Sequence, residues 1–294
     1  MDVTLTAEQQ RVLTWADSRR RDLPWRSTRD PWAVLVAEVM LQQTQVDRAQ
    51  PKWVAFLERF PTAKACAAAP LADVLQEWTG LGYPRRARNL HLTAIAIDQG
   101  GGTVPDTLDE LLAFPGIGPY TARAVLAFAF ESEAAVVDTN VGRILARRQG
   151  QKLTAAQAQV QADQWLVPGS SWAWNQGLLD LGALCCRAKE PVCVGCPVRR
   201  TCAWARSGWA APDPASGSAS VSVRQSRFEG SARQARGRLL RRTQQAPVSA
   251  AELCEVVGWA GQVDAIERAQ AVADSLLHDG LIDQDSQGRL VVAG

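Results

Sequence analysis

Residues 114–122, Phe-Pro-Gly-Ile-Gly-Pro-Tyr-Thr-Ala, decide the fold of this chain. Their prolines and glycines predict a tight turn, and the apolar run that follows predicts a helix directly after it. Asp106 or Thr107 can cap another helix that ends just before the turn. Because glycine has no Cβ, the backbone amides at Gly116 and Gly118 can approach an anion closely, beside the positive end of the second helix. The stretch therefore predicts a helix-hairpin-helix that binds a DNA phosphate, with a plain tight turn as the alternative.

Helical periodicity continues on both sides of this turn. Asp30 can cap a helix whose first residue is Pro31, and Pro51, Pro61 and Pro70 divide the next region into short helices. Further helices are expected at 6–20, from residue 31 to about 48, and at 139–149, 154–166 and 171–183. Since no convincing run of strands precedes residue 280, the first two thirds of the chain is predicted to be mainly helical.

Composition and length narrow the class of protein. The chain has 294 residues, 47% hydrophobic and 21% charged, which indicates a globular protein of one large or two to three ordinary domains and excludes a chain disordered throughout. The longest apolar run, 31–41, contains Glu38 and is shorter than the roughly 20 residues of a membrane span. The first residues lack the basic start and apolar core of a secretion signal. We therefore expect a cytoplasmic protein that contacts no membrane.

Residues 208–222 interrupt the helical pattern. They are rich in Gly, Ala, Ser and Pro and contain one charge, as a linker would. Helices are then expected at 231–243, 249–257 and 262–279, followed by two short strands around a polar turn with Gly288. Three helices and a hairpin predict a winged-helix-like module, and an ordinary packed helical appendage is the alternative.

Charge is distributed unevenly in this C-terminal segment. Residues 223–242 contain seven arginines and one glutamate, a net charge of +6, whereas residues 243–294 contain two arginines and eight acids, a net charge of −6. The arginines suit contact with a DNA backbone. Alternatively, they neutralise the acidic segment within one self-packed module.

Five of the seven cysteines fall within residues 185–202. Four of these have the spacing C-x6-C-x2-C-x5-C: Cys186, Cys193, Cys196 and Cys202. Four thiolates can hold a four-iron four-sulfur cluster or one zinc ion, and the spacing alone leaves both open. Cys185 is the expected spare. In an intracellular chain such a cluster indicates a metal site rather than a disulfide framework.

The loop between the first two of these cysteines is basic. It carries Arg187 and Lys189. A metal bound by the flanking thiolates would fix this loop in one shape, which suits contact with a phosphate backbone.

Two carboxylates stand out on either side of the glycine turn. Glu38 lies within an otherwise apolar helical stretch, and Asp138 directly precedes the helix expected at 139–149, where a simple N-cap is the alternative role. A buried carboxylate is costly unless it is paired or has a task. Breaking a glycosidic bond requires such a pair, because one acid protonates the leaving group and one carboxylate stabilises the oxocarbenium charge on the sugar.

Together these residues resemble the helix-hairpin-helix DNA glycosylase superfamily and, within it, the adenine DNA glycosylases (the MutY family). The resemblance covers roughly residues 8–210. Its motifs are LPWR at 23–26, EVMLQQTQV at 38–46, WTGLGY at 78–83, PGIGPYTA at 115–122, VDTNVGR at 137–143 and the four-cysteine loop. The resemblance implies an iron–sulfur cluster rather than zinc.

The resemblance also implies a mainly α, two-lobed fold. A six-helix barrel with the helix-hairpin-helix would span 22–131, and 1–21 with 132–210 would form a lobe that holds a [4Fe-4S] cluster. Beyond the reach of the resemblance, composition and element order predict a linker at 211–222 and the winged-helix-like module at 223–294. The implied protein is a monomeric bacterial repair enzyme at the nucleoid. It would flip adenine, paired with 8-oxoguanine or guanine, out of double-stranded DNA and remove it by hydrolysis.

The family's chemistry carries over to four residues. By this likeness Glu38 protonates the adenine ring, and Asp138 stabilises or transiently bonds to the sugar cation. Asn140 and Tyr120 would support Asp138 and the attacking water.

The family's DNA contacts carry over to five further residues. Arg26 would contact the flipped base. Gln43 and Tyr83 would be wedged into the duplex beside the lesion, and Leu41 and Thr44 would flank the opposing 8-oxoguanine.

The chain departs from the family's pattern at two places. Tyr83 is followed by Pro84, where the family usually has a second tyrosine or a similar residue, and proline fixes the backbone and removes an amide donor. Many members also carry a C-terminal domain that resembles hydrolases of oxidised nucleotides and reads 8-oxoguanine, and the tail after residue 215 is too short for it. Discrimination would then rest on the C-terminal module or on the barrel wedge.

Two other functions are possible for a chain with these motifs. An endonuclease III-like enzyme, which removes oxidised pyrimidines and nicks the strand, uses a lysine after the hairpin as a Schiff-base nucleophile. That position is Tyr120 here, and no lysine occurs between 65 and 151. A non-catalytic DNA-binding or redox-sensing relative would not need Glu38 or Asp138, and both are present.

Overall fold

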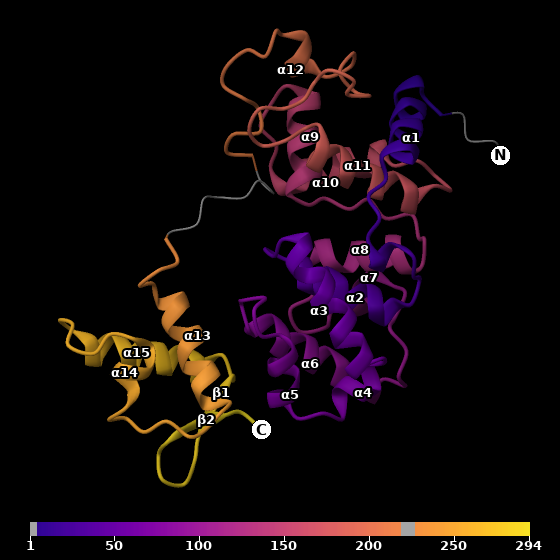
Figure 1. Cartoon of the computed structure of the whole chain (residues 1–294). Coiled ribbons are helices and arrows are strands. Elements are labelled where there is room, and N and C mark those ends of the chain that lie inside the picture. The colour runs from indigo at the N-terminus through magenta and orange to yellow at the C-terminus, as the bar shows by residue number, and fades with distance from the viewer. Residues whose placement is uncertain (1–4, 219–226) are drawn as a thin grey trace. The chain divides into compact units, whose positions relative to one another are not determined.

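The computed structural model describes residues 5–218 and 227–294 and confirms the mainly helical fold (Figure 1). The chain divides into two compact units. Unit 1 comprises Met1–Glu38, Pro105–Ala113 and Ile117–Val223, and unit 2 comprises Val39–Val104, Phe114–Gly116 and Arg224–Gly294. The lobe and linker boundaries expected from the sequence remain predictions. Within the described ranges, no helix is long and apolar enough to cross a membrane.

Unit 1 is built from helices with well-formed starts. Thr6 and Thr154 each close a capping box with a glutamine three residues later. Gly150 ends one helix in the left-handed conformation, with φ of 72°. The helices are α1 (Ala7–Arg19), the 3-10 helix η1 (Pro24–Arg26), α2 (Pro31–Leu41, which continues into unit 2), α7 (Leu108–Leu112), α8 (Pro119–Ala129), α9 (Thr139–Gln149), α10 (Ala155–Trp165), α11 (Ser171–Leu184) and α12 (Ala203–Arg206).

The core of unit 1 joins helices from both ends of its sequence. Val12 of α1, Leu145 of α9 and Leu181 of α11 are fully buried in one hydrophobic cluster. In the same cluster the rings of Trp165 and Trp174 meet edge to face, with centroids 5.0 Å apart. This packing fixes the start of α9, which carries Asp138, against the end of α11, which leads into the cysteine loop.

The expected helix-hairpin-helix is present as α7, a turn and α8. Gly116 has a φ of 75°, and a Cβ there would lie 2.4 Å from Asn89 Nδ2, so only glycine fits. Gly118 has ordinary backbone angles and precedes Pro119, the first residue of α8. A Cβ on Gly118 would meet no atom within 4 Å, so space remains beside the amides of this turn.

The helix expected from residue 31 to about 48 is too long. It is two helices, α2 (Pro31–Leu41) and α3 (Val46–Arg59), separated by a turn in which Gln43 has a φ of 57°. The carbonyl groups of Val39 and Met40 at the end of α2 accept hydrogen bonds from the side chain of Arg86, 2.9 and 3.0 Å away. A remote side chain thus replaces the amides that would have continued the helix.

The rest of the first half of unit 2 is a small helical layer. It contains α3, α4 (Ala63–Ala67), α5 (Leu71–Glu77) and α6 (Arg85–Gln99). The ring of Phe56 meets Phe60 and Trp78 edge to face, with centroids 5.0 and 6.2 Å apart. Trp53 and Trp78 are buried, as expected for core residues.

The C-terminal module contains the expected three helices and hairpin. Its elements are α13 (Ala232–Thr243), α14 (Leu253–Val257), α15 (Ala265–His278), β1 (Ile282–Gln284) and β2 (Leu290–Val292). The strands pair antiparallel with Asp283 opposite Val291, and Val248 bridges to Leu290 on the other side. Helices α14 and α15 start later than expected; Asp264, before α15, has a φ of 57°. The relation to winged-helix proteins remains a prediction.

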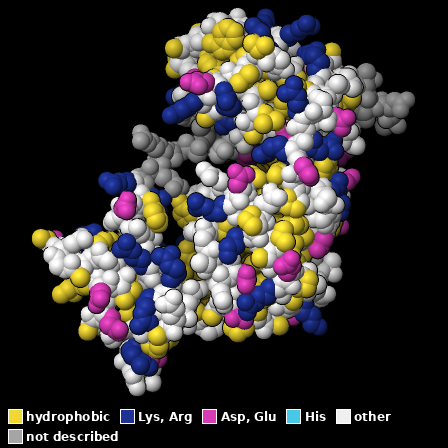
Figure 2. Space-filling model, in the orientation of Figure 1, with side chains coloured by type: hydrophobic (Ala, Val, Ile, Leu, Met, Phe, Trp, Pro, Cys, Tyr) yellow, Lys and Arg dark blue, Asp and Glu magenta, His cyan; other side chains and the backbone are white. Residues whose placement is uncertain are grey.

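The arginines of α13 make contacts inside this module. Arg236 pairs with Asp279 at 2.6 Å and also contacts Ser275, while Arg238 donates to the Val257 carbonyl at 3.2 Å. Acidic and basic side chains intermingle on the visible face of the module (Figure 2). Both observations favour a self-packed module over a free arginine run, although Arg224 lies outside the described residues.

Candidate active site

Glu38 is a buried carboxyl group on α2. Only 5% of the residue is exposed, and its Oε2 accepts a hydrogen bond of 2.8 Å from the Tyr120 hydroxyl. Burial, reinforced by the nearby charge of Asp138, raises the pKa of Glu38 to about 7, against the opposing influence of Tyr120 and Arg26. Near neutral pH the group therefore carries a proton about half of the time, so it can act as an acid.

Tyr120 lies in the first turn of α8, directly after the glycine turn. Burial and the neighbouring charges of Glu38 and Asp138 raise its pKa well above the usual value. The phenol therefore stays neutral and serves as a hydrogen-bond donor to Glu38. Tyr120 occupies the position where endonuclease III-like enzymes would have a lysine nucleophile. This residue is thus part of the carboxylate site.

Asp138 caps α9 and uses its two oxygens differently. Its Oδ1 accepts the Val141 amide at 2.7 Å, and its Oδ2 accepts the Asn140 side-chain amide at 2.9 Å. Burial raises the pKa of Asp138, while these hydrogen bonds and the charge of Arg143 oppose the rise. Asp138 is therefore the N-cap of α9, as the alternative expected. The same hydrogen bonds hold its carboxylate in a fixed orientation near Glu38.

Arg143 holds Asn140, which in turn contacts Asp138. The sequence did not indicate this role for Arg143. Its Nη2 donates to Asn140 Oδ1 and to the Gly182 carbonyl, both at 2.7 Å, and its Nε donates to the Cys186 carbonyl at 2.6 Å. Gly182 lets α11 approach closely, because a Cβ there would lie 2.4 Å from the Asn140 Cβ. The only sequence signals were the arginine within the 137–143 motif and a glycine inside an otherwise regular helix.

Arg26 is 8% exposed and forms a bidentate ion pair with Asp180, with N–O distances of 2.8 and 2.9 Å. It also lies near enough to Glu38 to oppose the rise of the Glu38 pKa. Its Nε is buried and has no hydrogen-bond partner among the described residues. Arg26 is therefore held in place with one donor available.

The residues expected at the duplex lie in unit 2. Leu41 ends α2, Gln43 and Thr44 form the turn after it, and Tyr83 ends the turn before α6. Gln43 and Tyr83 have φ values of 57° and 49°, and both side chains are exposed. The two expected wedge residues thus lie in two turns, each in the left-handed backbone conformation and each with an exposed side chain.

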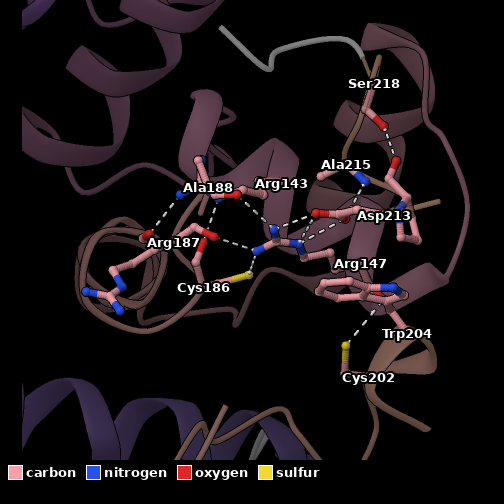
Figure 3. Close-up of polar contacts among 12 residues, drawn as sticks. Arg143, Arg147, Cys186, Arg187, Ala188, Cys202, Trp204, Asp213, Ala215 and Ser218 are labelled. Carbon is pink, nitrogen blue, oxygen red and sulfur yellow. Dashed lines mark hydrogen bonds and ion pairs between the residues drawn. The ribbon is translucent and has the colours of Figure 1, made fainter. Parts of the chain in front are cut away.

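The cysteine loop follows α11 (Figure 3). Five cysteines line one cavity, and all are free thiols: Cys185, Cys186, Cys193, Cys196 and Cys202. Among the described residues, no three His, Cys, Asp or Glu side chains are already arranged around a single ion. Arg187 and Lys189 lie exposed on the loop, as expected for a surface contact.

Arg147 of α9 links this loop to the segment that follows it. It donates to the Cys186 Sγ at 3.4 Å and to the Arg187 carbonyl at 2.7 Å, and it pairs with Asp213 at 2.6 Å (Figure 3). The Trp204 indole donates to the Ala210 carbonyl at 2.8 Å. The described part of the expected linker, 211–218, therefore packs against the rest of unit 1, to which it belongs, and residues 219–222 lie outside the described residues.

The arrangement places two carboxyl groups in different environments. Among the described residues Glu38 forms no ion pair, and its pKa is near neutrality, whereas Asp138 is held by the Val141 amide at the start of α9 and by Asn140. Such a difference separates an acid from a charge-stabilising carboxylate. The site is suited to breaking a glycosidic bond.

Comparisons with known proteins agree with this chemistry. Residues 36–167 match the model of the HhH-GPD superfamily of base excision DNA repair proteins. An adenine DNA glycosylase of Mycolicibacterium smegmatis is 43% identical over 291 residues, covering 96% of this chain and 95% of the relative, so the likeness extends into the C-terminal module.

Two solved structures share the helical fold. A thermostable thymine-DNA glycosylase has a TM-score of 0.63 and 27% identity, over 68% of this chain and 95% of that one. Endonuclease III trapped in a covalent DNA intermediate has a TM-score of 0.59 and 25% identity, over 70% of this chain and all of that one.

Glu38→Gln should stabilise the fold in a pH-dependent manner. A carboxyl whose pKa rises from 4.5 to about 7 on folding destabilises the fold as pH rises through that interval, by about 3 kcal/mol once it is fully ionised. Glutamine carries no charge, so the variant's gain in unfolding free energy should be larger at pH 8.5 than at pH 5.5. Denaturant unfolding at both pH values measures it.

Glu58, which is exposed on α3, supplies the matched control. Glu58→Gln should show no such growth with pH. An equal gain for Glu38→Gln at both pH values would contradict burial of an ionisable Glu38.

Proposed function

The chain belongs to the adenine DNA glycosylase family of the helix-hairpin-helix superfamily, and we propose that it removes adenine paired with 8-oxoguanine or guanine in double-stranded DNA, by hydrolysis alone. The observation that carries this proposal is the buried Glu38, hydrogen-bonded to Tyr120 beside the charge of Asp138. A flipped adenine needs a proton donor at its ring and a negative charge at its sugar, and these two carboxyls supply them.

The proposed reaction begins with proton transfer. Glu38 donates its proton to a ring nitrogen of the flipped adenine, so that the base leaves as a neutral molecule. Asp138 remains ionised and stabilises the positive charge that develops on the sugar. Its orientation is maintained by Asn140, which is itself held by Arg143. Water then attacks the sugar and gives its proton to the ionised Glu38, which restores the acid, and Tyr120 keeps Glu38 aligned throughout.

Arg26 is proposed to recognise the base. Its two terminal nitrogens are committed to Asp180, but its buried Nε is available to an acceptor on adenine. An arginine fixed by a bidentate pair loses little side-chain entropy when it binds. The ion pair therefore supports the base contact rather than competing with it.

The proposed DNA surface combines backbone and side-chain contacts. The amides at Gly116 and Gly118 would bind a phosphate, as would Arg187 and Lys189 on the cysteine loop. Gln43 and Tyr83 would fill the stack that the adenine vacates, with Leu41 and Thr44 beside the opposing base. We propose that the enzyme works as a monomer on the DNA of a bacterial nucleoid.

Residues Cys186, Cys193, Cys196 and Cys202 are proposed to hold a [4Fe-4S] cluster. Four free thiols that line one cavity fit the ligand set of such a cluster. Arg147 adds a guanidinium next to the Cys186 sulfur, which favours the thiolate form that binds iron. When bound, the cluster would supply a rigid anchor for the basic loop.

The endonuclease III-like alternative is less well supported. The likeness to endonuclease III concerns the fold, and the nucleophile position of that class is here occupied by Tyr120, whose hydroxyl is committed to Glu38. A phenol cannot form a Schiff base. A non-catalytic relative would have no use for a buried acid with a pKa near 7.

Glu38→Gln should abolish adenine release from a duplex with one adenine opposite 8-oxoguanine. The amide keeps the shape of the side chain but has no proton to donate, so the single-turnover rate should fall at least about 100-fold while duplex binding survives. Glu58→Gln, on the exposed face of α3, should retain the wild-type rate. Near-normal release by Glu38→Gln would contradict the assignment.

The product should be an intact abasic site. Since water attacks the sugar and no lysine lies between 65 and 151, the strand should break only after hot alkali. Gel electrophoresis with and without alkali distinguishes the outcomes. Efficient cleavage without alkali, together with an adduct trapped by borohydride, would instead indicate the bifunctional class.

The purified protein should be yellow-brown and contain about four irons per chain. Cys196→Ser should lose iron and the absorbance near 400 nm, because the cluster would lose a ligand. Cys185→Ser is the matched control, since Cys185 lines the same cavity and is not a proposed ligand. A colourless wild type with one zinc per chain would contradict the cluster, and loss of iron from Cys185→Ser would change the ligand assignment.

A further inference from the structure

Arg86, near the start of α6, joins the two turns that carry the wedge residues. Its two terminal nitrogens make six hydrogen-bond contacts, some of which share one N–H: two to the end of α2 and four to these turns. Nη1 donates to the carbonyls of Val39 (2.9 Å), Met40 (3.0 Å) and Gln42 (2.5 Å), and Nη2 donates to Thr44 Oγ1 (3.1 Å) and to the carbonyls of Leu81 (3.1 Å) and Gly82 (3.0 Å). One guanidinium thus connects residues about 40 positions apart in the sequence.

These hydrogen bonds surround backbone that is otherwise unfavourable. Gln43 and Tyr83 lie in the left-handed region, which non-glycine residues enter only at a cost. The acceptors at Gln42 and Thr44 flank Gln43, and those at Leu81 and Gly82 directly precede Tyr83. Arg86 therefore holds both unusual conformations at once.

Aromatic contacts complete the arrangement. The guanidinium carbon of Arg86 lies 5.4 Å from the ring centroid of Trp78 and 5.6 Å from that of Tyr83. The Trp78 indole donates to the Gly82 carbonyl at 3.2 Å. Burial lowers the pKa of Arg86 to about 10, so the group is still protonated at neutral pH and its hydrogen bonds remain charge-assisted.

We propose that Arg86 is the positioning residue that orients Gln43 and Tyr83 for joint insertion into the duplex, and that it thereby sets how readily adenine is extruded opposite 8-oxoguanine. The inference rests on the proposed function, because it takes the wedge role of these two residues as given. It assigns Arg86 no part in proton transfer. Pro84 is compatible with this role. The hydrogen bonds from Arg86 to the Leu81 and Gly82 carbonyls fix the turn and do not require the backbone amide that proline lacks.

Lysine could not replace Arg86 in this role. An ammonium group has three donors around one nitrogen, whereas the guanidinium spreads its donors over a planar fork that reaches both turns. Arg86→Lys keeps the charge and removes the bridge. The neighbouring Arg85, whose side chain is 67% exposed, offers a matched control in Arg85→Lys.

Base extrusion can be measured separately from chemistry. Each variant is built in the full-length Glu38→Gln chain and saturated with a duplex that carries 2-aminopurine, a fluorescent adenine analogue, opposite 8-oxoguanine. Fluorescence rises when the analogue leaves the stack. Arg86→Lys should lower the ratio of extruded to stacked base about tenfold, as expected for losing about one hydrogen bond from a charged donor. Arg85→Lys should change the ratio less than about twofold.

A double-mutant cycle distinguishes positioning from general destabilisation. In a chain that also carries Gln43→Ala and Tyr83→Ala, Arg86→Lys should have almost no further effect, because the residues through which it acts are gone. A tenfold fall in that background as well would overturn the proposal. So would a wild-type ratio in the Arg86→Lys single variant.

Failure of the proposed function would show separately. A chain with Glu38 intact that releases no adenine would contradict the proposed function, whatever the effect of the Arg86 variants.

If Arg86→Lys does not fold, Trp78→Phe tests the same bridge, since it removes the indole donor to Gly82. It should lower the ratio a few-fold, and an unchanged ratio in a folded, iron-loaded Trp78→Phe protein would overturn the proposal.

Discussion

The hydrogen bond from Tyr120 to Glu38 is the contact on which the site depends. A carboxyl removed from water keeps a proton more readily, and a neutral phenol can align it without forcing ionisation. The glycine turn places Tyr120 where it can form this hydrogen bond. Because Gly116 and Gly118 turn the chain directly into α8, Tyr120 arises in its first turn, near Glu38 and Asp138. The turn proposed to bind DNA therefore lies next in sequence to the residue that orients the acid.

Helix α9 connects the carboxylate site to the cysteine loop. Asp138 caps its N-terminus, and Arg143 and Arg147, which are four residues apart, lie on one face of the helix. Arg143 contacts Asn140 and the Cys186 carbonyl, and Arg147 contacts the Cys186 sulfur and Asp213. The cysteine loop thereby supports Asp138, the residue that we propose stabilises the sugar cation.

The sequence predicted what local chemistry determines. The cap at Asp138, the apolar periodicity and the glycine turn predicted the helices and the hairpin, and the spacing of the cysteines predicted the candidate ligands. Roles that depend on distant partners were not predicted. The end of α2 depends on Arg86, which lies 45 residues after Leu41. Segment 211–218 reads as a linker by composition, yet Asp213 pairs with Arg147.

Acid catalysis by Glu38 requires that this residue hold its proton near neutral pH, and its protonation can be measured directly. Infrared difference spectra between wild type and Glu38→Gln, recorded from pH 4.5 to 8.5, isolate the carboxyl stretch of this one residue. We expect the protonated band to disappear with a midpoint near pH 7, since burial raises the pKa of Glu38 to about 7. A midpoint near the ordinary glutamate value of about 4.5 would show that Glu38 is ionised at neutral pH, and would contradict its role as the acid.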